Sequence, residues 1–137
     1  MIKAALLYRI AFVVLVLMAA GHTYGFLTFR PPSLEGRAVL EAMRSVHFQV
    51  GHASYSYGHF YVGFGLFATI YMLFAAFVAW HLAGLAKTNP SAIGALGWAL
   101  FVVQLGSLAI SWIYISAAPA TLSAIVALCA GWAALIA

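Results

Sequence analysis

The sequence predicts an all-α integral membrane protein, a four-helix up-and-down bundle that forms a single domain over residues 1–137. Two observations carry this prediction. The chain is 66% apolar and only 6% charged, whereas about a quarter of the residues of a soluble domain are charged. It also contains four apolar stretches, each as long as the roughly 20 helical residues that cross a hydrocarbon core. Two acidic and six basic residues cannot cover a water-facing surface.

We expect the transmembrane helices at residues 4–28, 60–86, 92–115 and 119–137. Backbone groups in lipid must be satisfied within the segment or in a closed barrel, and the alternating strands of a barrel are absent. The first helix also has the basic start and apolar centre of a secretory signal ending near Gly21. Because the apolar run continues from His22 to Phe29, we expect a retained helix.

The connection between the first two helices is long, and we expect a short amphipathic helix at residues 33–50. Pro31 and Pro32 stop the first helix, Ser33 has the character of an N-cap, and Glu35 lies in the first turn, where the helix dipole favours an anion. At helical spacing one stripe is apolar or aromatic, namely Leu40, Met43, His47 and Val50. Such a helix lies on the membrane surface or caps a bundle.

We expect a multi-pass membrane protein with both termini in the cytoplasm. Lys3, Arg9 and Lys87 share one face, and the long connection carries Arg30, Arg37 and Arg44 on the other. The counts nearly balance, so the orientation follows the first helix, which usually dominates.

The densest polar patch is residues 47–65, HFQVGHASYSYGHFYVGFG. Up-and-down threading brings the end of the first helix, GHTYG, to the same face. The third helix carries a polar stripe, Gln104, Ser107 and Ser111. Because polar groups within a membrane face the bundle interior or a cavity, we expect this stripe to face the same region. We expect a ligand pocket there, lined by His22, Tyr24, His52, His59, Tyr61 and Gln104.

Each of these residues has a structural alternative. His22 fits a core histidine bonded to a neighbouring carbonyl or hydroxyl group. His52 and His59 fit an aromatic belt at the membrane interface, and His47 fits the amphipathic helix. Gln104 fits interhelical hydrogen bonding.

The signal for metal chemistry is weak, and the sequence identifies no cofactor. Imidazole suits zinc, copper and haem iron, but the chain has no HxxxH, no HExxH and no cysteine pair. A haem between His22 and a histidine of the second helix requires both at one depth. Acid–base chemistry on a lipophilic substrate would use His22 or His59, with Glu41 as the partner.

GHTYG at the end of the first helix, MRSVHF in the connection and SYGHFYVGFG at the start of the second helix resemble a group of uncharacterised small bacterial four-helix integral membrane proteins. The resemblance covers rather over half of the chain. It implies the same layout and a shared site at His22, His59 and the Gly-Phe-Gly of residues 63–65, and it brings no activity.

These observations favour a protein that binds a small or lipophilic ligand in a pocket at the long-connection face. Two alternatives stay open: a non-catalytic accessory subunit of a larger membrane complex, and a histidine-dependent isomerase or cyclase acting on a lipophilic substrate. The expected partners are the lipid bilayer, a lipophilic small molecule, and another membrane protein or a second copy. The basic charge is that of an ordinary membrane protein, so no nucleic acid is expected.

Overall fold

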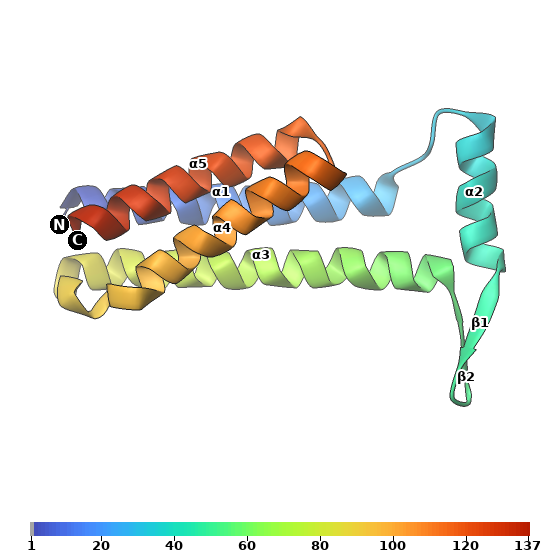
Figure 1. The fold of residues 1–137 in the computed structure, drawn as a ribbon, viewed down its shortest axis with the longest axis horizontal. Helices are drawn as coiled ribbons and strands as arrows, with labels where there is room; N and C mark the ends of the chain where they lie inside the picture. The colour runs from blue at the N-terminus through green and yellow to red at the C-terminus, as the bar shows by residue number, and fades with distance from the viewer. Residues whose placement is uncertain (1) are drawn as a thin grey trace. The chain divides into compact units, whose positions relative to one another are not determined.

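The computed structural model describes residues 2–137, and 85% of the chain is helical. The elements follow one another along the chain as labelled in Figure 1. In order they are α1 (Ile2–Thr28), α2 (Leu34–Ser45), β1 (His47–Val50), β2 (Ala53–Ser56), α3 (Tyr57–Thr88), a 3₁₀ turn (Pro90–Ala92), α4 (Gly94–Tyr114) and α5 (Ala117–Ile136).

Four of the helices, α1, α3, α4 and α5, are long and apolar enough to cross a membrane. This confirms the predicted all-helical fold with four candidate spans, and it indicates a multi-pass membrane protein. α4 and α5 have 21 and 20 residues, close to the minimum for crossing, whereas α3 has 32. At a rise of about 1.5 Å per residue, α3 is about 48 Å long. It therefore tilts or extends beyond a hydrocarbon core of about 30 Å.

The chain forms two compact units. The first contains the chain up to Ala19 together with Tyr71–Ala137, and the second is residues 20–70. α1 and α3 each contribute one part to each unit. α4 and α5 lie wholly in the first unit, while α2 and the two strands lie wholly in the second.

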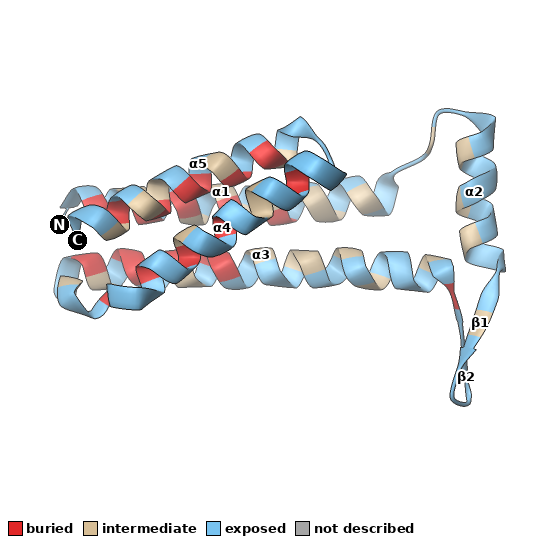
Figure 2. Ribbon diagram, in the orientation of Figure 1, coloured by how far each residue is buried: buried red, intermediate tan, exposed pale blue. Residues whose placement is uncertain are grey.

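The core of the first unit consists mainly of small residues with a few larger side chains. Tyr8, Leu15, Leu82 and Val126 are the largest fully buried apolar or aromatic side chains. Figure 2 shows buried residues in red along α1, α3, α4 and α5, and in α1, α3 and α5 most of them are alanines at helical spacing. In α3 these include Ala75, Ala79 and Ala83, and in α5 Ala120, Ala127 and Ala130. Small side chains let helix backbones approach closely, which is how helices associate in lipid.

Two glycines mark the closest approaches in this core. A Cβ on Gly97 of α4 would lie 2.6 Å from the hydroxyl oxygen of Tyr8 in α1. A Cβ on Gly131 of α5 would lie 2.8 Å from Cδ2 of Phe101 in α4. Each glycine therefore makes room for an aromatic ring of a neighbouring helix.

In the second unit, α2 begins as predicted but ends earlier. The Ser33 hydroxyl oxygen accepts a hydrogen bond from the Gly36 backbone N–H at 3.0 Å, which confirms the N-cap. The predicted helix over residues 33–50 is wrong beyond Ser45, because His47–Val50 form a strand paired with Ala53–Ser56. His47 and Val50 therefore do not continue a helical stripe. Val46 is already extended, with φ −79° and ψ 122°.

The two strands form a hairpin with a two-residue turn, Gly51-His52. Gly51 has φ +60°, a conformation open to glycine, and glycine at the first turn position is the pattern of a type II′ turn. The ring of Phe48 in β1 contacts Tyr55 across the hairpin and also Tyr57 and Phe60 of α3, with the two α3 ring centroids 5.0 and 5.1 Å away. These contacts fasten the hairpin to the first turns of α3.

We predict that Gly97→Ala lowers the free energy of unfolding by about 1–3 kcal/mol, because the new methyl group overlaps the Tyr8 hydroxyl. Gly106→Ala is the matched control in the same helix, since its Cβ would meet no atom within 4 Å. That substitution should be neutral or stabilising by up to about 1 kcal/mol. Thermal unfolding in detergent measures both, and equal effects would contradict the close approach.

Candidate functional site

The second unit holds most of the predicted site residues, and a small hydrogen-bond network joins its parts of α1 and α3. His22 Nε2 lies 3.0 Å from the Gly65 carbonyl oxygen. Because a carbonyl only accepts, Nε2 carries the proton and donates it. Thr69 Oγ1 donates to the same carbonyl at 3.2 Å and lies 2.7 Å from Thr23 Oγ1. His22 thus adopts the arrangement expected of a helix-bonding histidine.

Aromatic packing closes the same junction. Phe26 lies directly over Gly65, where a Cβ would come within 2.6 Å of its ring. The Phe26 ring centroid is 5.0 Å from that of His22 and 6.3 Å from that of Tyr61, which meets it edge-on. Gly65 is therefore required at this position, and Phe26 links His22 to the entry of α3.

His59 is held by the start of α3. The Ser56 hydroxyl oxygen accepts the His59 backbone N–H at 3.2 Å, and His59 Nδ1 accepts the Ser56 backbone N–H at 3.3 Å. This is a capping box in which imidazole replaces the usual Glu or Gln three residues after the cap. Since Nδ1 accepts, the proton of the neutral ring is on Nε2, which forms no hydrogen bond within the part of the chain that the structure describes.

A pocket of about 330 Å³, which we call the Arg44 pocket, opens beside His59. Its walls come from the end of α1, from α2, from both strands and from the first turns of α3. The apolar and aromatic part is Phe26, Leu27, Phe29, Leu40, Tyr61 and Val62, and the polar part is Arg44, His47, Ser56 and His59, with Gly58 between them. This size and lining are typical of small-molecule sites.

Arg44 is positioned by a close contact between α2 and α3. A Cβ on Gly58 would lie 3.3 Å from Arg44 Cγ and 3.2 Å from the Met43 carbonyl oxygen. The aliphatic stem of Arg44 therefore crosses the first turn of α3. Its guanidinium group has no ion pair or hydrogen bond among residues 2–137.

A second, more apolar hollow of about 520 Å³, which we call the Phe64 groove, runs along α3 beside the hairpin. It is lined by Ser54, Tyr55, His59, Phe60, Gly63, Phe64 and Phe67. His59 lines both the groove and the Arg44 pocket.

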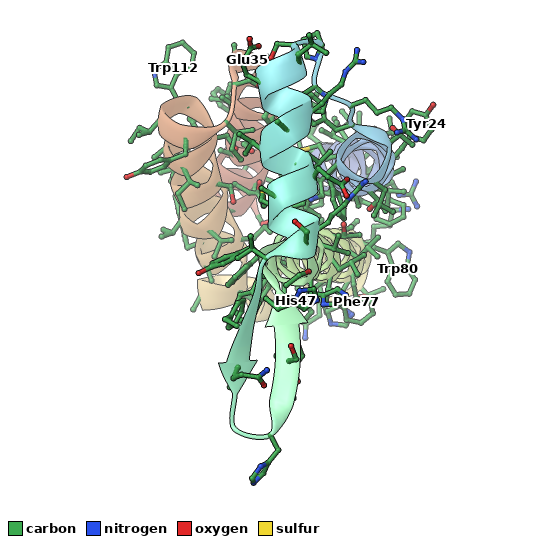
Figure 3. The ribbon with its side chains drawn as sticks, turned by 90° about the vertical axis from the view of Figure 1, so that its right-hand side faces the viewer. Tyr24, Glu35, His47, Phe77, Trp80 and Trp112 are labelled. Atoms are coloured by element: carbon green, nitrogen blue, oxygen red, sulfur yellow. The ribbon has the colours of Figure 1, made fainter. Side chains whose placement is uncertain are left out.

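Among the predicted site residues, His59 and Tyr61 line the Arg44 pocket, whereas His22 lies behind Phe26 and lines neither hollow. Tyr24 is 73% exposed and points outward from α1 (Figure 3). His52 lies exposed at the hairpin turn. Gln104 belongs to the first unit, where it is buried, and its Oε1 has no hydrogen-bond partner in the described chain.

Sequence reasoning missed Arg44 and gave His47 only a helical role. Arg44 counted only among the cations of the long connection, and no local pattern in the sequence marks it as a pocket residue. His47 is in β1, at the junction with α2 (Figure 3), and its Nδ1 donates to the Ser45 carbonyl oxygen at 2.7 Å.

The proposed acid–base and metal arrangements are not assembled. Glu41 makes no ion pair in the described chain, and neither His22 nor His59 bonds to it. Within residues 2–137, no three His, Cys, Asp or Glu side chains gather as metal ligands. His22 faces Gly65, six residues or about 9 Å along α3 from His59, so a haem held by both at one depth does not fit.

We predict that His22→Ala lowers the free energy of unfolding by about 0.5–2 kcal/mol, because the Gly65 carbonyl loses a donor from the neighbouring helix. His52→Ala should change nothing measurable, because His52 is exposed in a turn. Thermal unfolding in detergent compares the two variants. Equal stability would mean that His22 does not hold α1 and α3 together.

Comparisons of the chain with models of protein families, with curated proteins and with solved structures found no match.

Proposed function

We propose that the protein is a small polytopic membrane protein that binds a lipophilic ligand in the Arg44 pocket. One observation carries the proposal. A pocket of about 330 Å³ is lined by apolar and aromatic side chains together with four polar ones, namely Arg44, His47, Ser56 and His59. Cavities of this size and composition are the usual form of ligand sites. The lining residues come from α2, β1, β2 and α3 and from the end of α1, so the pocket lies where five elements meet.

In this proposal α1, α3, α4 and α5 cross a bacterial inner membrane up and down, and both termini are cytoplasmic. α2 lies along the opposite surface and lines the pocket with Leu40 and Arg44. An N-cap at Ser33 and Glu35 in the first turn support a stable helix there. The resemblance to small four-helix bacterial proteins supports the same layout.

Ligand retention tests the function. Native mass spectrometry of the gently purified protein should show one bound lipophilic molecule. Val62→Trp should abolish this mass, because Val62 lines the pocket and an indole would fill it. Ile70→Trp is the control in the same helix, because Ile70 is 59% exposed and lines neither hollow.

Two results would favour other functions. If the wild-type protein purifies without a bound small molecule but in a defined complex with other subunits, the accessory role replaces ligand binding. If it turns over a lipophilic compound and His59→Ala stops turnover without unfolding, the isomerase or cyclase reading replaces it.

Labelling of single cysteines tests the topology. Cys129→Ser removes the native thiol, and His52→Cys and Asn89→Cys then report on the hairpin turn and on the turn between α3 and α4. In intact cells a membrane-impermeant maleimide should label the first variant and should reach the second only after permeabilisation. Labelling of both cysteines from the same side would contradict the up-and-down arrangement. Labelling of only the Asn89→Cys variant in intact cells would show that the orientation is the opposite one.

A further inference from the structure

We propose that the Arg44 pocket and the Phe64 groove form one bipartite site for an anionic amphiphile. The charged oxygens of the ligand lie beside Arg44, and its hydrocarbon chain lies in the groove. This inference rests on the proposed function and names its ligand class. The charge of Arg44, the hydrogen-bonding roles of the histidines and the presence of His59 in the lining of both hollows support it.

The charge at the pocket is positive and is not compensated from within the chain. The chain has two acidic residues. Glu41 is in α2 but does not line the pocket, and Glu35 lies at the far end of α2 from His47 (Figure 3). Neither forms an ion pair with Arg44. A guanidinium group with its donors unused binds a phosphate or carboxylate through two parallel, charge-assisted hydrogen bonds.

The histidines differ in what they offer to such an anion. His59 uses Nδ1 as an acceptor in the capping box, so its neutral ring presents Nε2–H as a donor. His47 uses Nδ1–H as a donor to the Ser45 carbonyl, so its neutral ring presents an acceptor at Nε2. Arg44 and His59 therefore supply the donors, and the neutral ring of His47 supplies an acceptor.

The apolar part of the site begins where the polar part ends. His59 lines both hollows, so the two are neighbours at this residue. Beyond it lie Phe60, Phe64 and Phe67, one turn apart along α3, with Gly63 as the open floor. The groove, at about 520 Å³, is larger than the pocket. An acyl chain can pack against these aromatic rings, whereas a free inorganic anion has no apolar part to place there.

Titration in a non-ionic detergent, followed by native mass spectrometry, tests the ligand class. The probes are dioleoyl phosphatidylglycerol, dioleoyl phosphatidylcholine, oleate and inorganic phosphate. We expect a 1:1 adduct with phosphatidylglycerol at a Kd about tenfold lower than with phosphatidylcholine, whose chains are identical. Oleate separates a carboxylate from a phosphate ligand, and inorganic phosphate should neither bind nor compete at the same concentration.

Two sets of variants, one for each end of the site, test the two parts separately. Arg44→Gln should remove the preference for phosphatidylglycerol over phosphatidylcholine, and Arg44→Lys should retain part of it. Arg30→Gln carries the same charge change on an exposed residue outside both hollows and should leave the preference intact. Gly63→Leu should weaken both lipids equally by filling the groove. Gly21→Leu is its control, because a Cβ at either glycine would meet no atom within 4 Å.

The results distinguish this inference from the proposed function. If both lipids bind alike and Arg44→Gln changes neither, the anionic amphiphile is excluded while a lipophilic ligand stands. If inorganic phosphate competes as well as the lipid does, the ligand is a free anion and the amphiphile is again excluded. If no probe binds and Val62→Trp leaves the purified protein unchanged, the proposed function itself fails. If Arg30→Gln and Arg44→Gln act equally, the preference is general surface charge and the bipartite site is excluded.

Discussion

The absence of water inside a bilayer is the constraint on which this structure depends. Backbone groups must be satisfied within each helix, and burial of apolar surface no longer drives one helix onto another. Association then depends on close packing and on hydrogen bonds between helices. In the first unit, alanines occupy the buried faces, and Gly97 and Gly131 make room for Tyr8 and Phe101. In the second unit, Gly65 does the same for Phe26 and also offers its carbonyl to His22.

Several polar side chains of the second unit form hydrogen bonds that hold its elements together. His22 holds α3, and Ser56 and His59 cap each other at the start of α3. His47 ties β1 to the last residue of α2. Each structural bond uses one ring nitrogen and thereby decides which hydrogen-bonding role the other nitrogen can play. The candidate site therefore consists of groups that form no hydrogen bond with another described residue, namely Nε2–H of His59 and the guanidinium of Arg44, together with the aromatic surface of α3.

An anionic amphiphile agrees with both the composition and the geometry of this unit. A chain with only two carboxylates has little means of neutralising a cation next to apolar surface, so a lipid or fatty acid is the natural counterion there. Arg44 can reach this position because its stem crosses Gly58, where any side chain would meet it at 3.3 Å. Pocket and groove then meet at His59, so one molecule with a charged end and an apolar chain suits both.

The sequence by itself determined the four apolar helices to within three residues at each end and the N-cap at Ser33, because hydropathy and capping chemistry are local properties. It also marked His59 and Tyr61 as site residues. The hairpin was missed because four-residue strands carry little periodic signal and Gly51 was the one local cue to the turn. Only the tertiary structure decided that Arg44 and His47 line a pocket while Tyr24 and His52 line neither hollow. Those positions depend on contacts between segments distant in sequence, such as Phe26 over Gly65, and no local pattern encodes such contacts.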